Sequence, residues 1–297
     1  MRAYLALAIV CIVWGTTYMA LRIGVESFPP FLFSGIRNTA AGLILLIILF
    51  ISGRLPRLGI KEIAPQLLPG VLMVAIGNGF VGWSEQYIPS GLAALIVSIM
   101  PVYVVLINFA TSREKKTPSW SVLAGLTLGF MGIVLIFRDN LRDLAKPGYL
   151  LGIILSFIAV LSWAAGTIVA KKQKTSTDAF TNASLQLSSG GLVLLFLSPF
   201  IDNYEGVSAI SASGIYALIY LIFIGSILAY NCYLYALKHL PVTTVSLYTY
   251  INPFIALLLG VLFLGESTTW ITWLALGSTL CGIFLLTFKP GKRQTPV

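Results

Sequence analysis

The stretch LPVTTVSLYTYINPFIALLLGVLFLGE (240–266) decides the fold of this chain. Its landmarks Pro241, Pro253 and Glu266 are spaced 12 and 13 residues apart. The same residue types with the same spacing stand 152 positions upstream, at Pro89, Pro101 and Glu114. Each triplet encloses an apolar run with a proline inside it. This recurrence indicates that the chain was built from two copies of one unit.

The composition predicts a membrane protein. Of the 297 residues, 58% are hydrophobic and only 10% are charged, whereas a soluble globular domain carries about 25% charged residues. The net charge of +9 comes from basic residues in short loops between apolar runs, which favours membrane orientation over nucleic-acid binding. The cysteines lie inside apolar runs without metal-ligand spacing, so we expect buried thiols rather than disulfides or metal ligands at Cys11, Cys232 and Cys281.

Ten apolar runs are long enough to cross a bilayer, and helices are the expected spanning element because the runs do not alternate polar and apolar residues. They cover 4–24, 31–51, 67–84, 91–111, 119–137, 149–170, 180–201, 213–236, 243–264 and 270–288. The first run exceeds the roughly 7–15 apolar residues of a signal peptide, so we expect it to be a retained span. Five runs fall in each predicted unit, 1–138 and 149–289.

Lysine and arginine are distributed unevenly between the two sides of these spans. With the N-terminus in the cytoplasm, the inner side holds Arg2, Arg54, Arg57, Lys61, Arg113, Lys115, Lys116, Lys171, Lys172, Lys174, Lys238, Lys289, Lys292 and Arg293. The outer loops hold only Arg138, Arg142 and Lys146. This bias predicts that both termini are cytoplasmic.

The repeat continues outside the opening stretch. Four residues recur 149 positions later: Trp14, Ser27, Phe31 and Gly42 match Trp163, Ser176, Phe180 and Gly191. Because five spans is an odd number, the second unit must enter the membrane from the opposite side. Such inverted repeats predict alternating access to a site near the midplane, where the two units meet.

Polar and aromatic side chains recur inside the apolar runs, where each polar group needs a partner. Aromatic rings beside a few hydrogen-bonding groups suit a pocket for a small amphipathic organic solute. The predicted substrate-binding residues are Trp14, Tyr18, Asn78, Trp163, Asn231, Tyr235, Tyr248 and Asn252. Core packing is the alternative for Trp14 and Trp163, whereas the amide side chains favour a cavity.

Five further residues are predicted to gate or bend the structure: Arg22, Arg37, Glu85, Pro101 and Pro253. A proline within a helix frees the carbonyl four residues back, so the two prolines are either simple kinks or hinges for alternating access. The three charged residues fall near the outer face. Arg22 can pair with Glu26, four residues on. Arg37, the deepest charge, is either an outer gate or a contact for a substrate carboxylate, or else a snorkelling or paired arginine.

No catalytic motif, metal-ligand cluster or nucleotide-binding loop is present, which predicts a protein that is not an enzyme and needs no cofactor. The single histidine, His239, adjoins Lys238 and fits a solvated loop better than a proton relay. The expected partners are a small organic solute and the lipid bilayer, with no nucleic acid. The oligomeric state stays open, a monomer included.

Three long segments resemble the EamA-type permeases of the drug/metabolite transporter superfamily, and their YedA-like subgroup in particular. They are WGTTYMALRIGVESFPPFLFSGIR (14–37), GNGFVGWSEQYIPSGLAALIVSIMP (77–101) and GSILAYNCYLYALKHLPVTTVSLYTYINPFIALLLGVLFLGE (225–266). The resemblance covers both halves and implies ten transmembrane helices in two inverted five-helix repeats. It also implies export of amino acids or other small metabolites across a bacterial-type inner membrane.

Two other functions remain as alternatives. The superfamily includes translocators of lipids or lipid-linked sugars, and small multidrug exporters that couple drug export to protons through a glutamate in the first helix. Here the first span has no acid before Glu26, at its outer end, which disfavours that mechanism. The leading hypothesis is therefore a secondary transporter of small organic metabolites.

Overall fold

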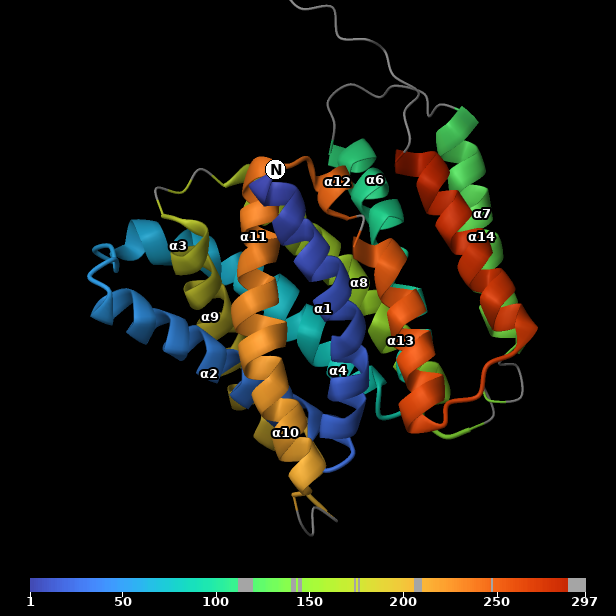
Figure 1. Cartoon of the computed structure of the whole chain (residues 1–297), viewed down its shortest axis with the longest axis horizontal. Coiled ribbons are helices and arrows are strands. Elements are labelled where there is room, and N and C mark those ends of the chain that lie inside the picture. Colours follow the sequence, from blue (N-terminus) through green and yellow to red (C-terminus); the bar gives the residue numbers. More distant parts are fainter. Residues whose placement is uncertain are drawn as a thin grey trace, which may run out of the picture.

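The computed structural model describes residues 1–111, 120–139, 143, 146–173, 175, 177–205, 210–246 and 248–287. In this part of the chain all regular secondary structure is helical (Figure 1). The N-terminal half contains α1 (Arg2–Val25), α2 (Pro30–Ile51), α3 (Ile60–Pro69), η1 (Gly70–Asn78), α4 (Gly79–Ser84), α5 (Ser90–Val97), α6 (Met100–Thr111) and α7 (Trp120–Asp139). The C-terminal half contains α8 (Tyr149–Lys172), α9 (Ala179–Ile201), α10 (Ala212–Tyr220), η3 (Leu221–Leu228), α11 (Ala229–His239), α12 (Val242–Val245), α13 (Tyr248–Leu264) and α14 (Trp270–Thr287).

Within the described residues, seven helical stretches are long and apolar enough to cross a membrane. They correspond to the first four expected spans and to the sixth, seventh and eighth. The fifth and tenth expected spans coincide with α7 and α14, and the ninth is shortened to the 17-residue helix α13. The predicted all-helical membrane architecture is therefore confirmed.

The third span differs from its expected bounds because it begins at Ile60 rather than at residue 67. Lys61 and Glu62 lower the hydropathy of its first turn, so the apolar pattern understated its length. The Glu62 carboxylate accepts a hydrogen bond from the Gly59 backbone N–H (3.0 Å), which caps the helix start.

Both the third and the eighth spans change from α-helix to π-helix in the middle. In the third span η1 lies between α3 and α4, and in the eighth η3 lies between α10 and α11. A π-helical segment widens the turn and leaves backbone carbonyls free for partners outside the helix. Here such partners come from neighbouring helices: Ser162 Oγ donates to Leu72 O (2.8 Å) and Trp14 Nε1 donates to Gly225 O (3.1 Å).

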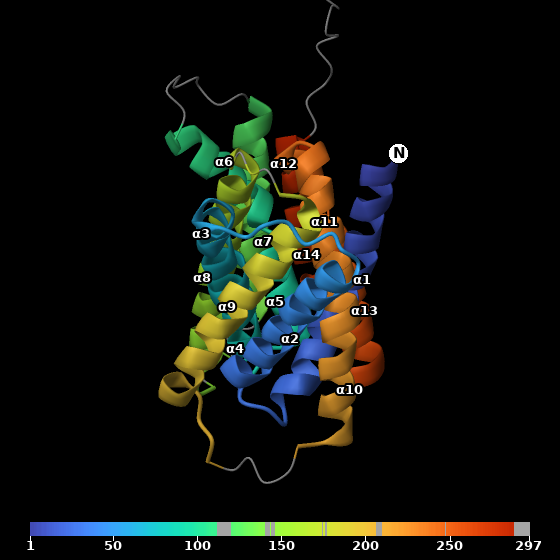
Figure 2. The ribbon, with the colours of Figure 1, turned by 90° about the vertical axis from the view of Figure 1, so that its left-hand side faces the viewer.

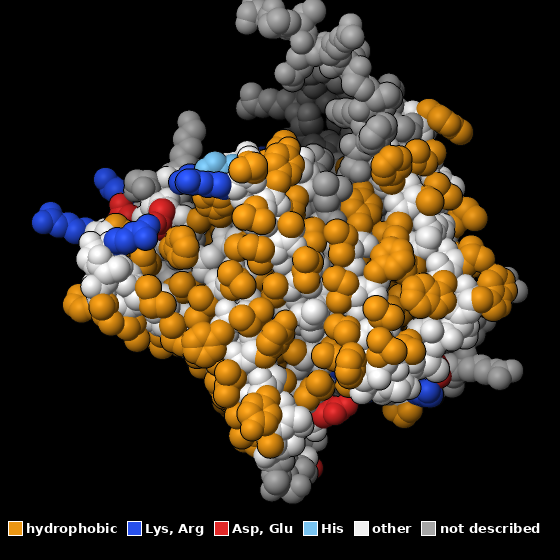
Figure 3. Space-filling model, in the orientation of Figure 1, with side chains coloured by type: hydrophobic (Ala, Val, Ile, Leu, Met, Phe, Trp, Pro, Cys, Tyr) orange, Lys and Arg blue, Asp and Glu red, His pale blue; other side chains and the backbone are white. Residues whose placement is uncertain are grey.

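The outer surface of the bundle is apolar along its sides and charged at its ends (Figure 3). Large exposed hydrophobic side chains include Phe50, Phe196, Phe200, Leu262 and Phe263. Lysine and arginine gather beside α3, at the end of the bundle where the N-terminus also lies (Figures 1 and 3). A continuous apolar side surface of this kind is compatible with lipid and not with water.

Two carboxylates of the C-terminal half hold helix N-termini of the other half. Asp202 accepts hydrogen bonds from the backbone N–H groups of Phe31 (3.0 Å) and Leu32 (2.8 Å) at the start of α2. Glu266 accepts hydrogen bonds from the backbone N–H (2.8 Å) and the hydroxyl (2.7 Å) of Ser90 at the start of α5. Negative charge is favoured there because the first N–H groups of a helix lack internal partners.

Close packing between α2 and α9 depends on two glycines that occupy matched positions in the halves (Figure 2). A Cβ atom on Gly42 of α2 would lie 2.6 Å from the backbone nitrogen of Ser188, and one on Gly191 of α9 would lie 2.5 Å from that of Thr39. Each glycine thus faces the other helix. The pair α7 and α14 packs in the same reciprocal way through Gly132 and Gly282.

Replacing Gly191 with alanine should destabilise the bundle, because the added methyl group would meet the backbone of α2 and force the helices apart. We expect a loss on the order of 1–3 kcal/mol, measured as a lower thermal midpoint of the purified protein in detergent. The matched control is Gly277→Ala in α14, where nothing lies within 4 Å of the added atom. Equal midpoints for the two variants would contradict this account of the α2–α9 contact.

Candidate functional site

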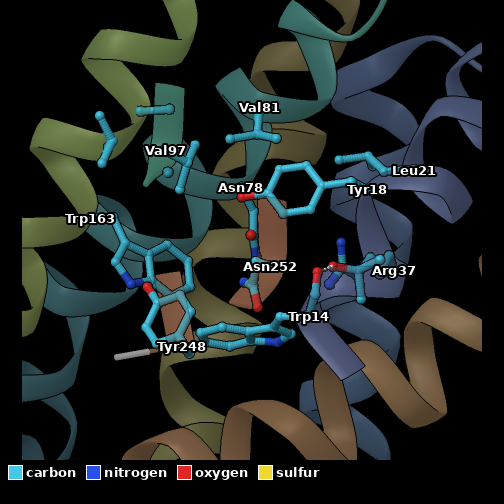
Figure 4. A pocket seen from close by; sticks show the side chains of 14 residues that line it. Trp14, Tyr18, Leu21, Arg37, Asn78, Val81, Val97, Trp163, Tyr248 and Asn252 are labelled. Carbon is cyan, nitrogen blue, oxygen red and sulfur yellow. Dashed lines mark hydrogen bonds between the residues drawn. The ribbon is translucent and has the colours of Figure 1, made fainter. Parts of the chain in front are cut away.

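A cavity of about 60 Å³ lies inside the bundle, and helices from both halves form its wall. Figure 4 shows the side chains around it. The lining residues are Trp14, Thr17, Tyr18 and Leu21 of α1; Arg37 of α2; Gly77 and Asn78 of η1; Val81 of α4; Val97 of α5; Ala159, Val160 and Trp163 of α8; and Tyr248 and Asn252 of α13. The wall is mostly aromatic and aliphatic with a few polar groups, as in sites for small organic molecules.

Five buried rings pack together on one side of this cavity, and we call them the aromatic cluster: Trp14, Trp163, Tyr230, Tyr233 and Tyr248. The ring centroids of Trp14 lie 5.3 Å from those of Trp163 and 5.0 Å from those of Tyr233 and Tyr248. Edge-to-face pairs at such distances contribute stability beyond area burial. The cluster joins α1, α8, α11 and α13 into one unit.

A second, more polar cavity of about 220 Å³ lies among α3, α8, α9 and α11, and we call it the polar vestibule. It is lined by Gln66, Ala170, Lys171, Gln173, Thr175, Ala179, Asn182, Gln186, Leu234, Leu237 and Lys238. Tyr230 links the two regions, because its ring contacts Trp163 (6.2 Å) while its hydroxyl donates to Gln186 Oε1 (2.7 Å). Through Tyr230, the aromatic cluster therefore contacts a wall residue of each cavity.

The structure brings most of the predicted binding residues together. Those that line the cavity are Trp14, Tyr18, Asn78, Trp163, Tyr248 and Asn252. Asn231 and Tyr235 are not among the lining residues. The Asn231 amide donates to Ile227 O (2.6 Å) within its own span, and the Tyr235 ring packs on His239 (4.3 Å) at the end of α11.

Sequence reasoning selected a different face of α11 from the one that joins the cluster. Tyr230 and Tyr233 turn inward, and the Tyr233 hydroxyl is hydrogen-bonded to Thr167 Oγ1 (2.5 Å). The signal was present, since Tyr230 and Tyr233 are three residues apart and share a helix face. The spacing of Asn231 and Tyr235 is four, which describes an equally good face, so periodicity alone could not choose between them.

Two of the predicted charged residues are buried, and the third is partly exposed. Arg22 forms the expected ion pair with Glu26 (3.7 Å) and also donates to the backbone carbonyl of Glu85. Arg37 is 4% exposed, lines the cavity, and its Nε donates to Ser226 Oγ (3.0 Å) on η3 of the other half. The Glu85 side chain is fully buried immediately after α4.

Both predicted prolines belong to broken spans. The fourth span is divided between α5 and α6 just before Pro101, and the ninth is divided between α12 and α13 upstream of Pro253. Next to Pro253, the Asn252 amide can donate to Tyr248 O and to Cys11 O, each at 2.9 Å. This side chain therefore satisfies backbone carbonyls near the break and ties α13 to α1.

The remaining residues singled out by the sequence have simpler environments. His239 is exposed and its Nδ1 lies 2.8 Å from Tyr235 O, as a residue at a solvated helix end would. The cysteines are free: Cys11 is buried and Cys232 is half-buried. The expected burial is wrong for Cys281, which is exposed, because the apolar surface of this bundle faces lipid and a thiol is acceptable there.

An internal cavity walled by two helical halves, in a bundle whose sides are apolar, is typical of a membrane transporter. The chain belongs to the EamA-like transporter family, whose model matches residues 1–138 and 150–288. It is 34% identical over 293 residues to the inner membrane transporter YedA of Escherichia coli (strain K12), covering 98% of this chain and 92% of that one. It is 26% identical to the transporter YoaV of Bacillus subtilis (strain 168), covering 99% of each.

The fold also has a counterpart among solved structures. A crystal structure with 16% sequence identity superposes with a TM-score of 0.68 and covers 96% of both chains. At this level of identity the similarity concerns the fold alone.

Removing the Ser226 hydroxyl should leave Arg37 with one fewer partner inside the protein. We expect Ser226→Ala to lower stability by about 1–3 kcal/mol, because hydrogen bonds to charged groups are among the stronger ones. A thermal double-mutant cycle with Arg37→Gln should show that the two effects are not additive. Ser52→Ala is the control, since its hydroxyl donates locally to Leu49 O (3.1 Å) on an exposed turn; additive effects at Arg37 and Ser226 would refute the coupling.

Proposed function

We propose that this chain is a secondary transporter that exports small carboxylate-bearing organic solutes, such as neutral or aromatic amino acids. In this proposal its ten spans form two inverted five-helix repeats, which expose the central cavity alternately to each side of a bacterial inner membrane. The observation that carries the proposal is the cavity itself, because its wall combines aromatic rings, amides and one buried guanidinium from both halves.

Reciprocal contacts support the repeat. The matched glycines Gly42 and Gly191 face each other's helices, and the two π-helical segments occupy equivalent spans. The donors to these segments correspond as well, since Trp14 belongs to α1 and Ser162 to the equivalent helix α8. Such pairs are expected where two related units pack around a pseudo-two-fold axis, as in inverted-repeat transporters.

The chemistry of the cavity supports the solute class. Arg37 supplies positive charge, and no Asp or Glu occurs among the residues that line the cavity. A carboxylate is the natural partner of a guanidinium, because paired N–H donors match its oxygens. Trp14, Trp163 and Tyr248 provide flat apolar surfaces for the remainder of the solute.

The small volume of the cavity supports alternating access. A volume of about 60 Å³ holds only a few water molecules, so the wall must move apart to admit an organic solute. In this proposal the aromatic cluster is the barrier between the cavity and the polar vestibule. Separation of these rings would join the two cavities and open the site to the end of the bundle that carries the N-terminus.

Counterflow of labelled neutral and aromatic amino acids into proteoliposomes tests this function. Trp14→Ala or Trp163→Ala should reduce flux by about tenfold, equivalent to about 1.4 kcal/mol, because each removes a ring from the cavity wall. The matched control is Trp270→Ala, whose ring is 71% exposed on the outer surface and which should transport normally. Saturable flux for none of the solutes, together with scrambling of labelled lipid, would instead favour a lipid translocator.

The proposed orientation has its own test. Reporter fusions after the first and second spans should place residue 27 on the periplasmic side and residue 55 in the cytoplasm, because basic residues are retained on the cytoplasmic side. A reporter enzyme that is active only outside the cytoplasm checks the first fusion, and a fluorescent protein that matures only inside checks the second. The opposite pattern would place the polar vestibule on the periplasmic side of the membrane instead of the cytoplasmic side.

A further inference from the structure

The Glu85 side chain has no partner of its own. It is 0% exposed, and neither carboxylate oxygen receives a hydrogen bond. Other acids of the described chain are engaged: Asp202 and Glu266 bind helix N-termini, while Glu26 pairs with Arg22. An ionised carboxylate buried without partners is strongly disfavoured, whereas the neutral acid is tolerated.

The charged groups around Glu85 are directed elsewhere in this conformation. Arg22 on α1 donates to the Glu85 backbone carbonyl and pairs with Glu26, and Arg37 on α2 donates to Ser226. Burial raises the pKa of the Glu85 carboxyl well above its ordinary value; Arg22 and Arg37 lower the pKa and Glu266 raises it.

One tyrosine also lies near the Glu85 carboxyl. Tyr18 on α1 lies within electrostatic range of the carboxyl and itself lines the cavity. Glu85 is also one helical turn beyond Val81, another residue of the cavity wall. The carboxyl therefore adjoins the solute site without lining it.

We propose that Glu85 is a proton-binding site that couples solute movement to protons. The coupling step of this inference rests on the proposed transport function, whereas proton binding by Glu85 does not. In the conformation described above the carboxyl holds a proton and Arg37 stays on Ser226 of the other half. When the adjacent wall opens to water, the O–H bond of the acid breaks and the proton passes to water.

Release of that proton changes the partners of Arg37. The carboxylate that remains attracts the guanidinium towards the N-terminal half and away from η3. Because Arg37 also lines the cavity, the position of its charge then differs between the proton-loaded and proton-free states. The proton on Glu85 therefore sets where the guanidinium of Arg37 lies in the cavity wall, which is the physical link between proton and solute.

Proton binding is tested without any solute. The purified full-length protein is treated with dicyclohexylcarbodiimide, which reacts with protonated carboxyl groups in apolar surroundings, and the adduct is mapped by peptide mass spectrometry. We expect an adduct on Glu85 whose rate of formation falls as pH rises, by about tenfold per pH unit above the pKa. Glu26, with 60% of its side chain exposed, is the internal control and should remain largely unlabelled.

Absence of the Glu85 adduct, or a rate independent of pH, would overturn the proton site. Glu85→Gln should abolish the adduct in this peptide, and Glu85→Asp should restore it if the carboxyl alone is required. Size-exclusion chromatography establishes that both variants are folded.

Coupling is tested with a solute that shows counterflow. In wild-type proteoliposomes a pH gradient should drive its accumulation. Glu85→Gln should retain counterflow and lose this accumulation, because exchange needs no net proton movement. A wild type that exchanges the solute but ignores the gradient overturns coupling and leaves the transport function intact. A protein without counterflow contradicts the transport function, and carbodiimide labelling then decides proton binding alone.

Discussion

The structure depends on satisfying backbone polar groups where water is absent. In hydrocarbon each unpaired N–H or C=O group is costly, so a chain can depart from the regular α-helix only where another group can form the missing hydrogen bond. The π-helical segments and the broken spans of this protein are such departures. Trp14 and Ser162 supply donors to carbonyls of η3 and η1, and Asn252 does the same beside the break in the ninth span.

Some of these hydrogen bonds also hold the cavity wall together. Trp14 reaches Gly225 O across the boundary between the halves, and its ring belongs to the aromatic cluster. Two residues that make irregular backbone tolerable, Trp14 and Asn252, thus also wall the site. A change in the cavity wall therefore requires a change in the irregular backbone, because a polar group left without a partner in the interior is not satisfied by water. Opening and closing of the cavity are expected to be discrete for this reason.

Much of the architecture could be read from the sequence. Low charge content and long apolar runs required lipid-facing helices, and prolines at matched spacing located both broken spans. The pairing of Arg22 with Glu26 also followed from spacing. The pattern could not predict the rotation of each helix about its own axis, which decides the side chains that face inward. On α11 two aromatic faces were equally consistent with helical spacing, and only packing against Trp163 and Thr167 selected Tyr230 and Tyr233 over Asn231 and Tyr235.

The sequence by itself determined that the protein faces lipid and that its spans are helical, because both follow from composition and from the length of the apolar runs. It also predicted the recurrence of one unit, from residue spacing along the chain. Tertiary structure decided which glycines meet a backbone, which ring closes the cavity and which carboxyl is left without a partner. Those properties depend on atoms from spans that are distant in sequence. The local sequence around Glu85 could not predict that Arg22 donates to a backbone carbonyl and Arg37 to a serine, because both arginines lie in other helices.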